Sequence, residues 1–343
     1  MLNGILRFFG IFSNNIGVDL GTANTVIYLE GKGVVLSEPS IVAVDVRTGK
    51  VLAVGKEAKE MLGKTPGSIQ TIRPLRDGVI TDFEATRIML SYMINKVIGK
   101  GIFKAKPRVV IGVPSGVTQV EKRAVIDAAK SAGAREVYLI AEPMAAAIGA
   151  GLPIDEPVGN MVVDVGGGTT EIAVISLAGI VTSTSIRVAG DEMTEAIANY
   201  VKKKYHILIG EQTAERIKIE LGSALIEEQE KTMEIKGRDM TGLPKTVSIS
   251  NFDIAQALED VVSSIINAIK LTLEKTPPEL TSDIAERGIV LAGGGSLLKN
   301  LDTRIYRETG IFTRYCEDPM TAVARGVGSV LDKMHLIRQV AME

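Results

Sequence analysis

The feature that most constrains this chain is a glycine-rich loop, Asp164–Glu171, between two apolar segments. Met161–Val163 precedes the loop and Ile172–Ile175 follows it, a pattern that predicts a β-hairpin. Its three consecutive glycines, Gly166–Gly168, leave the backbone N–H groups bare, and such groups form anion sites that suit phosphate. Because the carboxylate of Asp164 would repel phosphate, the loop also implies a divalent cation. Mg²⁺ fits best, held by one or two carboxylates and by phosphate oxygens.

A second segment of the chain repeats this pattern. Ile16–Tyr28 runs from apolar residues to Asp19, then to Gly21 and Thr22, then into another apolar strand. A single glycine loop is weak evidence, because a tight hairpin without a ligand has the same pattern. The two aspartates, Asp19 and Asp164, lie 145 positions apart (164 − 19), which predicts two related domains facing each other across a cleft. Neither loop has the lysine of a P-loop, which excludes a Walker-type site.

Length and composition exclude several other classes of protein. A chain of 343 residues predicts two domains, and a net charge of −2 gives no basic patch for nucleic acid. Cys316 is the only cysteine, so no intramolecular disulfide can form and a reducing cytosol is expected. With only His206 and His335, a His/Cys zinc site and a Ser-His-Asp triad are both disfavoured. No apolar run reaches the roughly 18 residues of a transmembrane helix.

The first twelve residues form an amphipathic segment. Their bulky apolar side chains follow helical spacing and could lie flat in a membrane interface. The alternative is a tail that packs on the protein's own surface or stays disordered. The loop 99–104 offers a second possible membrane contact, or a loop tip folded onto the body. The proposed membrane residues are Leu2, Ile5, Leu6, Phe9, Phe12, Ile102 and Phe103.

The remaining pattern alternates strands and helices. Strands are predicted over 33–36, 40–45, 108–114, 137–140, 180–187 and 288–292. Helices are predicted over 57–62, 82–98, 120–133, 144–151, 190–205, 211–221, 252–274 and 322–331, and a small β insertion over 223–253. Glu142 follows a strand, at the edge where open α/β sheets bind ligands. A third glycine cluster, Gly293–Gly295, could let backbone approach a flat base.

Three glycine loops with two matched aspartates resemble the signature of the actin, sugar-kinase and heat-shock-chaperone ATPase superfamily. Longer motifs resemble one family more closely, the MreB family of bacterial actin homologues that support rod shape. The resemblance extends from about residue 16 to 335. Its motifs are Asp19–Thr25, Arg73–Val79, Glu142–Gly149, Asp164–Glu171, Thr276–Leu280 and Gly293–Leu298.

This resemblance implies an α/β protein with an actin-like fold. Two related α/β domains, each with a large and a small subdomain, would surround a nucleotide cleft that holds ATP and Mg²⁺. The implied boundaries are 1–15 for the amphipathic segment, 16–32, 76–150 and 327–343 for subdomain IA, 33–75 for IB, 151–190 and 254–326 for IIA, and 191–253 for IIB.

The resemblance also implies roles for individual residues. Asp19 and Asp164 should orient the hydrated metal, Glu142 should position or polarise the attacking water, and Thr169 should sit beside the γ-phosphate. The catalytic set is therefore Glu142, Thr169 and Asp164. The phosphate-binding residues implied are Asp19, Gly21, Thr22, Ala23 and Asn24 on one side, with Gly166, Gly167, Gly168 and Thr169 on the other. Those implied near the ribose and base are Ala214, Glu215, Arg216, Ile217, Lys218, Gly294, Gly295, Ser296 and Leu297.

Without the resemblance, the charges of 211–221 would simply indicate a solvated helix face. The function implied is an ATP-dependent, membrane-associated, actin-like filament protein that organises cell-wall elongation and maintains rod shape. It would hydrolyse ATP to ADP and phosphate as it polymerises. Its partners would be further copies of itself in paired protofilaments, the inner face of the cytoplasmic membrane, and cell-wall elongation proteins, with no nucleic acid. It would therefore be cytoplasmic and peripherally membrane-associated.

Two alternatives share this fold. A small-molecule, sugar-type kinase should release ADP in proportion to an added hydroxyl substrate, whereas a filament protein should hydrolyse ATP alone. A chaperone ATPase half is disfavoured because such proteins carry a further substrate-binding domain, and this chain ends at Glu343.

Overall fold

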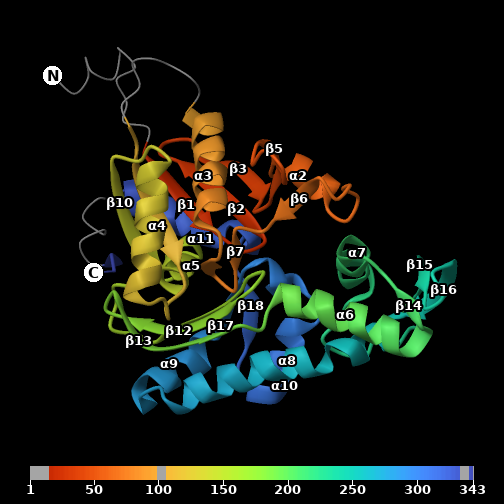
Figure 1. Cartoon of the computed structure of the whole chain (residues 1–343). Helices are drawn as coiled ribbons and strands as arrows, with labels where there is room; N and C mark the ends of the chain where they lie inside the picture. Colours follow the sequence, from red (N-terminus) through yellow and green to blue (C-terminus); the bar gives the residue numbers. More distant parts are fainter. Residues whose placement is uncertain (1–14, 99–105, 333–339, 343) are drawn as a thin grey trace. The chain divides into compact units, whose positions relative to one another are not determined.

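The computed structural model describes residues 15–98, 106–332 and 340–342 (Figure 1). Its described residues form two compact units. The first contains the residues up to Glu156, Leu177–Gly179 and the residues from Thr321 on, and the second contains Pro157–Ser176 and Ile180–Met320. The predicted membrane residues Leu2, Ile5, Leu6, Phe9, Phe12, Ile102 and Phe103 lie outside the described residues.

The first unit is built on a five-stranded sheet of order β10-β9-β1-β2-β3. The hairpin β1–β2 is antiparallel, as is the pair β2–β3, whereas β1, β9 and β10 are parallel. The strands are β1 (Ile16–Leu20), β2 (Asn24–Leu29), β3 (Gly33–Pro39), β9 (Arg108–Val113) and β10 (Glu136–Ala141). A smaller sheet, β5-β4-β6, carries helix α2, and a two-stranded ribbon joins β7 to β8. These elements are β4 (Val42–Asp45), β5 (Val51–Val54), α2 (Lys56–Met61), β6 (Ile69–Ile72), β7 (Leu75–Arg76) and β8 (Val79–Ile80).

Side chains along a strand alternate between the two faces of a sheet, and in the first sheet helices cover both faces. Val18 and Ile111 point into the core shared with α3 (Phe83–Ile98) and α4 (Gln119–Ser131), which lie side by side in Figure 1. Gly17, on the opposite face, meets α11 (Ala322–Asp332), which also packs against α5 (Glu142–Gly149).

The second unit repeats the strand order of the first. Its sheet runs β18-β17-β11-β12-β13, with an antiparallel β11–β12 hairpin and with β11, β17 and β18 parallel. The strands are β11 (Asn160–Val165), β12 (Thr170–Ser176), β13 (Gly179–Ile186), β17 (Ile289–Ala292) and β18 (Thr313–Tyr315). The internal repeat predicted from the two hairpins is therefore present in the sheets.

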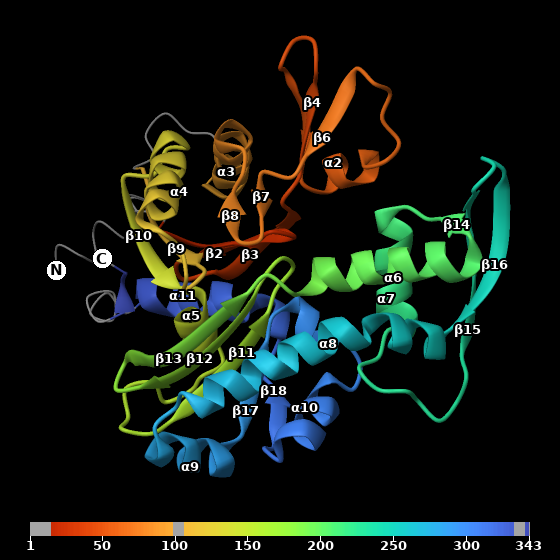
Figure 2. The same cartoon turned by 60° about the horizontal axis from the view of Figure 1, so that its bottom comes forward.

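A large apolar core joins this sheet to its helices. Helix α8 packs against β12, as Figure 2 shows, and α6 packs against both α7 and α8. The helices are α6 (Gly190–Tyr205), α7 (Glu211–Leu221), α8 (Asn251–Glu274), α9 (Pro278–Arg287) and α10 (Leu301–Thr309), with short 3₁₀ turns η1 (Gly294–Leu297) and η2 (Pro319–Thr321). The small sheet β14-β15-β16 comprises β14 (Ile207–Leu208), β15 (Thr232–Asp239) and β16 (Pro244–Ser250).

Every strand and helix predicted by range has a counterpart, with boundaries that differ by a few residues. The segment 33–75 contributes its first strand, β3, to the larger sheet and its later strands to the small one. Helices α9 and α10 and strands β5, β6, β7, β8, β14 and β18 lie outside the predicted ranges. The division into four subdomains stays a prediction. Among the described residues, no helix is long and apolar enough to cross a membrane.

Candidate functional site

The first glycine loop is the tight connection between β1 and β2. Gly21 has no room for a side chain, since a Cβ there would lie 2.6 Å from the carbonyl oxygen of Asn24. Ser40 fixes the loop from β3's end: its hydroxyl donates to the carbonyl of Gly21 at 2.7 Å, and its N–H donates to that of Ala23 at 3.0 Å. Ser40 was not predicted as a site residue, although a hydroxyl beside apolar strand residues was an available signal.

Thr22 connects this loop to the Arg73–Val79 motif. Its buried hydroxyl accepts a hydrogen bond from the N–H of Gly78 at 3.0 Å. Asp77 and Gly78 both have left-handed backbones, with φ of 50° and 74°, and this turns the N–H toward Thr22. Because a hydroxyl can accept and donate at once, Thr22 can still donate to a ligand. The motif thus supports the loop directly.

Asp19 and Glu142 come to the same edge of the first sheet. Asp19 lies beside Gly112 in the parallel β1–β9 pair, and Glu142 directly follows β10, the strand on the other side of β9. A Cβ on Gly112 would lie 3.5 Å from Cγ of Glu142, an ordinary van der Waals distance, so the buried glutamate packs beside this glycine. Burial raises the pKa of Asp19 to about 7. A nearby cation would favour the ionised form, which fits a metal-directed carboxylate.

The second glycine loop joins β11 to β12 and is closed by a hydrogen bond from the N–H of Gly166 to the carbonyl of Thr169, at 2.9 Å. The start of α6 binds its carbonyl groups: the N–H of Gly190 donates to Gly166 at 3.1 Å, and that of Asp191 donates to Gly167 at 2.7 Å. These bonds occupy oxygens that would otherwise repel a phosphate. The loop is thereby fixed to the start of α6, and its role as an anion site stays a prediction.

The third glycine cluster packs against Asp164. This aspartate is buried and lies beside Ala292 in the parallel β11–β17 pair. Gly293 has φ of 81°, and a Cβ there would lie 2.3 Å from Oδ1 of Asp164. A Cβ on Gly295 would lie 2.7 Å from Cγ1 of Val165. These two glycines are thus required for close packing against the end of β11.

The 3₁₀ turn η1 follows directly. Ser296 is fully buried, and its hydroxyl donates to the carbonyl of Gly293 at 2.7 Å, so this side chain closes the turn. Gly294 lies near Met320, whereas the side chain of Leu297 is half-exposed. Among the predicted residues Gly294–Leu297, the exposed side chain is that of Leu297.

Two charges of α7, Lys218 and Glu215, belong to a polar network, whereas Glu211, Arg216 and Glu220 are exposed. Lys218 donates to the carbonyl of Gly190 at 2.8 Å and to the hydroxyl of Thr194 at 2.9 Å, and it pairs with Glu215 at 2.7 Å. Since Gly190 also binds the second glycine loop, this network links α7 to that loop. Thr194 was not predicted, because nothing local marks it. The other predicted residues of α7 divide by exposure: Ala214 and Ile217 are fully buried in the core, and Arg216 is exposed.

Each unit therefore presents one aspartate near the carboxyl end of a central strand, followed by a glycine-containing turn. No group of three or more His, Cys, Asp or Glu side chains that could hold a metal occurs within residues 15–98, 106–332 and 340–342. Magnesium binding by Asp19 and Asp164 stays a prediction, which asks for only one or two carboxylates beside phosphate because Mg²⁺ keeps most of its waters.

Comparisons with known proteins agree on one family. The family model described as MreB/Mbl protein matches residues 13–339. The cell shape-determining protein MreB of Escherichia coli K12 is 52% identical over 335 residues, covering 96% of each chain. The cell shape-determining protein Mbl of Bacillus subtilis is 51% identical, covering 94% of this chain and 97% of the relative.

Solved structures confirm the fold. The crystal structure of MreB5 of Spiroplasma citri bound to ADP has a TM-score of 0.88 at 39% identity, covering 94% of this chain and 97% of that one. The MamK double helical filament, at 24% identity and a TM-score of 0.79, shares the fold. These relatives support a cytoskeletal protein over the kinase alternative. The chain has the actin-like fold and belongs to the MreB/Mbl family.

Proposed function

We propose that this chain is an ATP-dependent, actin-like filament protein that determines cell shape by organising cell-wall elongation. The observation that carries the proposal is the duplicated hairpin, in which Asp19 and Asp164 are each the last residue but one of a central strand that leads into a glycine-containing turn. Relatives that share about half of its residues over nearly the whole chain are named cell shape-determining proteins, which supports the same role here.

The ligand proposed is a nucleotide. MreB5 of Spiroplasma citri has been solved bound to ADP and to AMPPNP, at 39% and 40% identity to this chain. The first unit would contribute Asp19, Gly21, Thr22, Ala23 and Asn24 to the phosphates. The second would contribute Gly166, Gly167, Gly168 and Thr169 to the phosphates, with Ala214, Glu215, Arg216, Ile217, Lys218, Gly294, Gly295, Ser296 and Leu297 near the ribose and base. Because Ala214, Ile217 and Ser296 are fully buried, they would act through backbone atoms.

The reaction proposed is hydrolysis of ATP to ADP and phosphate. Asp19 and Asp164 would hold Mg²⁺ through its waters, and the bound ion would neutralise phosphate charge. Glu142 would accept a hydrogen bond from the attacking water and orient it, while Thr169 would lie beside the γ-phosphate. Phosphoryl transfer depends mainly on positioning and charge stabilisation, so no covalent intermediate on the protein is needed.

The assembly proposed is a homopolymer of paired protofilaments on the inner face of the cytoplasmic membrane, working with cell-wall elongation proteins. Residues 1–12 and the Ile102–Phe103 pair would contact the membrane. Each half-buried side chain would contribute on the order of 1 kcal/mol, so a monomer would bind weakly and a filament strongly. The four-subdomain division of the actin-like fold is proposed for this chain as well.

Electron microscopy of the purified protein with ATP, with and without anionic vesicles, tests these proposals together with a phosphate-release assay. Filaments that form with ATP and coat vesicles are expected, and ATP should be hydrolysed without any added hydroxyl substrate. Deleting residues 1–12 should abolish most vesicle binding but leave filaments in solution. Hydrolysis that occurs only with an added sugar would support the kinase, and a truncated chain that binds vesicles normally would refute the membrane segment.

A further inference from the structure

The last described residues of the chain, Val340–Met342, lie along the outer edge of β10. We call this segment the C-terminal strap. Ala341 pairs with Ile140 in an antiparallel bridge, and the N–H of Met342 donates to the carbonyl of Leu139 at 2.9 Å. Val340 is buried, and Met342 packs against the apolar core of the first unit. The strap therefore has both backbone and side-chain contacts with the sheet.

The strap binds the end of β10 that matters for the proposed chemistry. On its inner side β10 pairs with β9 along its whole length, but on its outer side it is the edge strand of the sheet. An edge strand has unpaired backbone groups and opens more readily than a central strand. The strap pairs with Leu139 and Ile140, and the chain reaches Glu142 two residues later.

The other flank of Glu142 is held by α11, which precedes the strap in the chain. A Cβ on Gly326 would lie 1.8 Å from the carbonyl oxygen of Ala145, so α11 and α5 touch through their backbones. A Cβ on Gly112 would lie 3.0 Å from Val323 of α11 and 3.5 Å from Cγ of Glu142. Val323 and Glu142 thus border the same small space above β9.

We infer that the C-terminal strap is a positioning element for Glu142. By pairing with β10 it fixes the strand end, while α11 fixes the first turns of α5, so the glutamate is held from both sides. This inference rests on the proposed hydrolysis of ATP. The strap itself touches none of the proposed nucleotide-binding residues in the described contacts, so its loss should slow the chemistry more than it weakens binding.

A proline substitution in the strap isolates the hydrogen bond. Met342→Pro removes the N–H that donates to Leu139. Met342→Ala removes the same side chain but keeps the N–H, so it is the matched control. ATP binding is followed with a fluorescent ATP analogue, phosphate release with a coupled assay, and exchange of the 136–141 amides by mass spectrometry.

In Met342→Pro, the backbone amides of residues 136–141 should exchange faster than in the control. Phosphate release should be slower, on the order of tenfold, because small misplacements of a catalytic group have such effects. The affinity of Met342→Pro for the ATP analogue should stay close to that of Met342→Ala. The inference is overturned if Met342→Pro hydrolyses ATP like its control, or if affinity and hydrolysis fall in parallel. A wild-type chain that releases no phosphate refutes the proposed function instead, while amide exchange still shows whether the strap holds β10.

Discussion

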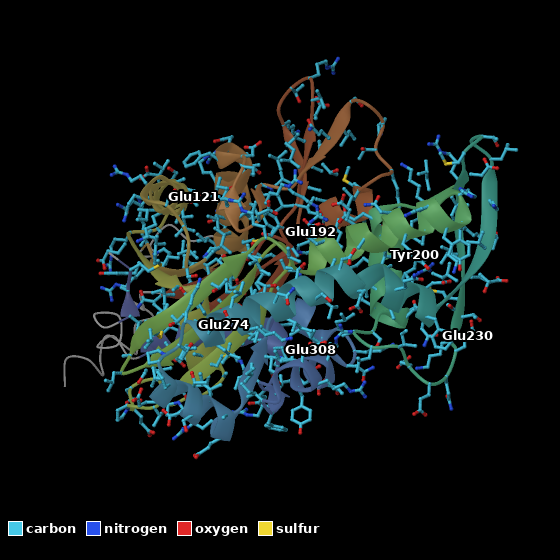
Figure 3. The ribbon with its side chains drawn as sticks, turned by 90° about the horizontal axis from the view of Figure 1, so that it is seen from below. Glu121, Glu192, Tyr200, Glu230, Glu274 and Glu308 are labelled. Carbon is cyan, nitrogen blue, oxygen red and sulfur yellow. The ribbon has the colours of Figure 1, made fainter. Side chains whose placement is uncertain are left out.

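Asp253 should be one of the most important single side chains for the stability of the second unit. It is buried at the start of α8, where it forms a capping box with Ser250. Lys204 and Tyr205, at the end of α6, both donate hydrogen bonds to its carboxylate. The hydroxyl of Tyr200, labelled on α6 in Figure 3, lies 3.3 Å from the same carboxylate and shares its one proton with Oε1 of Gln256, at 2.8 Å. One carboxylate thus joins two helices that are far apart in the sequence.

The cost of Asp253→Ala follows from these contacts. Loss of the capping box should cost about 1 kcal/mol. Loss of the hydrogen bonds to a charged acceptor should cost about 2 kcal/mol more, at the low end for such bonds because Lys204 is half-exposed. We therefore expect the free energy of unfolding to fall by about 3 kcal/mol. Asp253→Asn keeps the shape and one acceptor oxygen, and should cost about half as much.

The pH dependence gives a sharper signature. Burial alone would raise the pKa of Asp253, but hydrogen bonds from Lys204 and Tyr205 outweigh it and hold the pKa below 3.8. Its stabilisation is therefore present above the unfolded pKa and is lost as pH falls through the folded pKa. Burial and the bond to Asp253 raise the pKa of Tyr205 from 10.0 to about 12, so that contribution is complete below pH 10 and is lost as pH rises toward 12.

Urea unfolding of the full chain, followed by circular dichroism from acid to alkaline pH, measures this contribution. The difference between wild type and Asp253→Asn should be constant from about pH 5 to 9 and shrink on both sides. Asp260→Asn is the matched control, because Asp260 is an exposed carboxylate on the same helix. If Asp253→Asn costs no more than this control, or if the difference does not change in acid, the assigned role of Asp253 is wrong.

Three further predictions concern the nucleotide. Glu142→Ala should leave ATP binding nearly intact and slow phosphate release by a factor on the order of 10². Phosphate release at the wild-type rate would contradict the catalytic role of Glu142. Asp164→Asn should shift the Mg²⁺ dependence of ATP binding to higher concentrations, whereas unchanged affinity at every Mg²⁺ concentration would contradict metal binding. Thr22→Val deprives the N–H of Gly78 of its acceptor and should weaken ATP binding about tenfold in a fluorescence titration. Thr22→Ser keeps the acceptor, so equal losses in both variants would argue against the hydrogen bond.

Most of the fold could be predicted because its signals are local. Apolar runs broken by glycine mark both hairpins, and helical periodicity marks α3 and α8. The missed elements have short or ambiguous signals. Pro277 and Pro278 follow the end of α8, but proline also favours the first position of a helix, and α9 begins at Pro278. Strand β18 is only three residues long and depends on pairing with β17.

The candidate site was predictable only in part, for the same reason. Asp19 and Asp164 stand out because each lies between an apolar strand and a glycine turn. The side chains that hold those turns in place do not stand out. Ser40 reaches Gly21 across 19 positions of sequence, and Lys218 reaches Gly190 across 28. Such contacts arise from the packing of whole elements, which local patterns do not specify.

The contact between α5 and α11 shows what a sequence pattern leaves open. Both helices are rich in alanine and glycine, a composition that does not specify how the helices pack. In the structure, a Cβ on Gly149 would lie 1.9 Å from the carbonyl oxygen of Ala322, and a Cβ on Gly326 would lie 1.8 Å from that of Ala145. The two glycines thus make reciprocal contacts, and neither position can hold a larger residue unless the helices separate. Because α5 begins at Glu142, the identity of these glycines bears on the proposed chemistry as well as on packing.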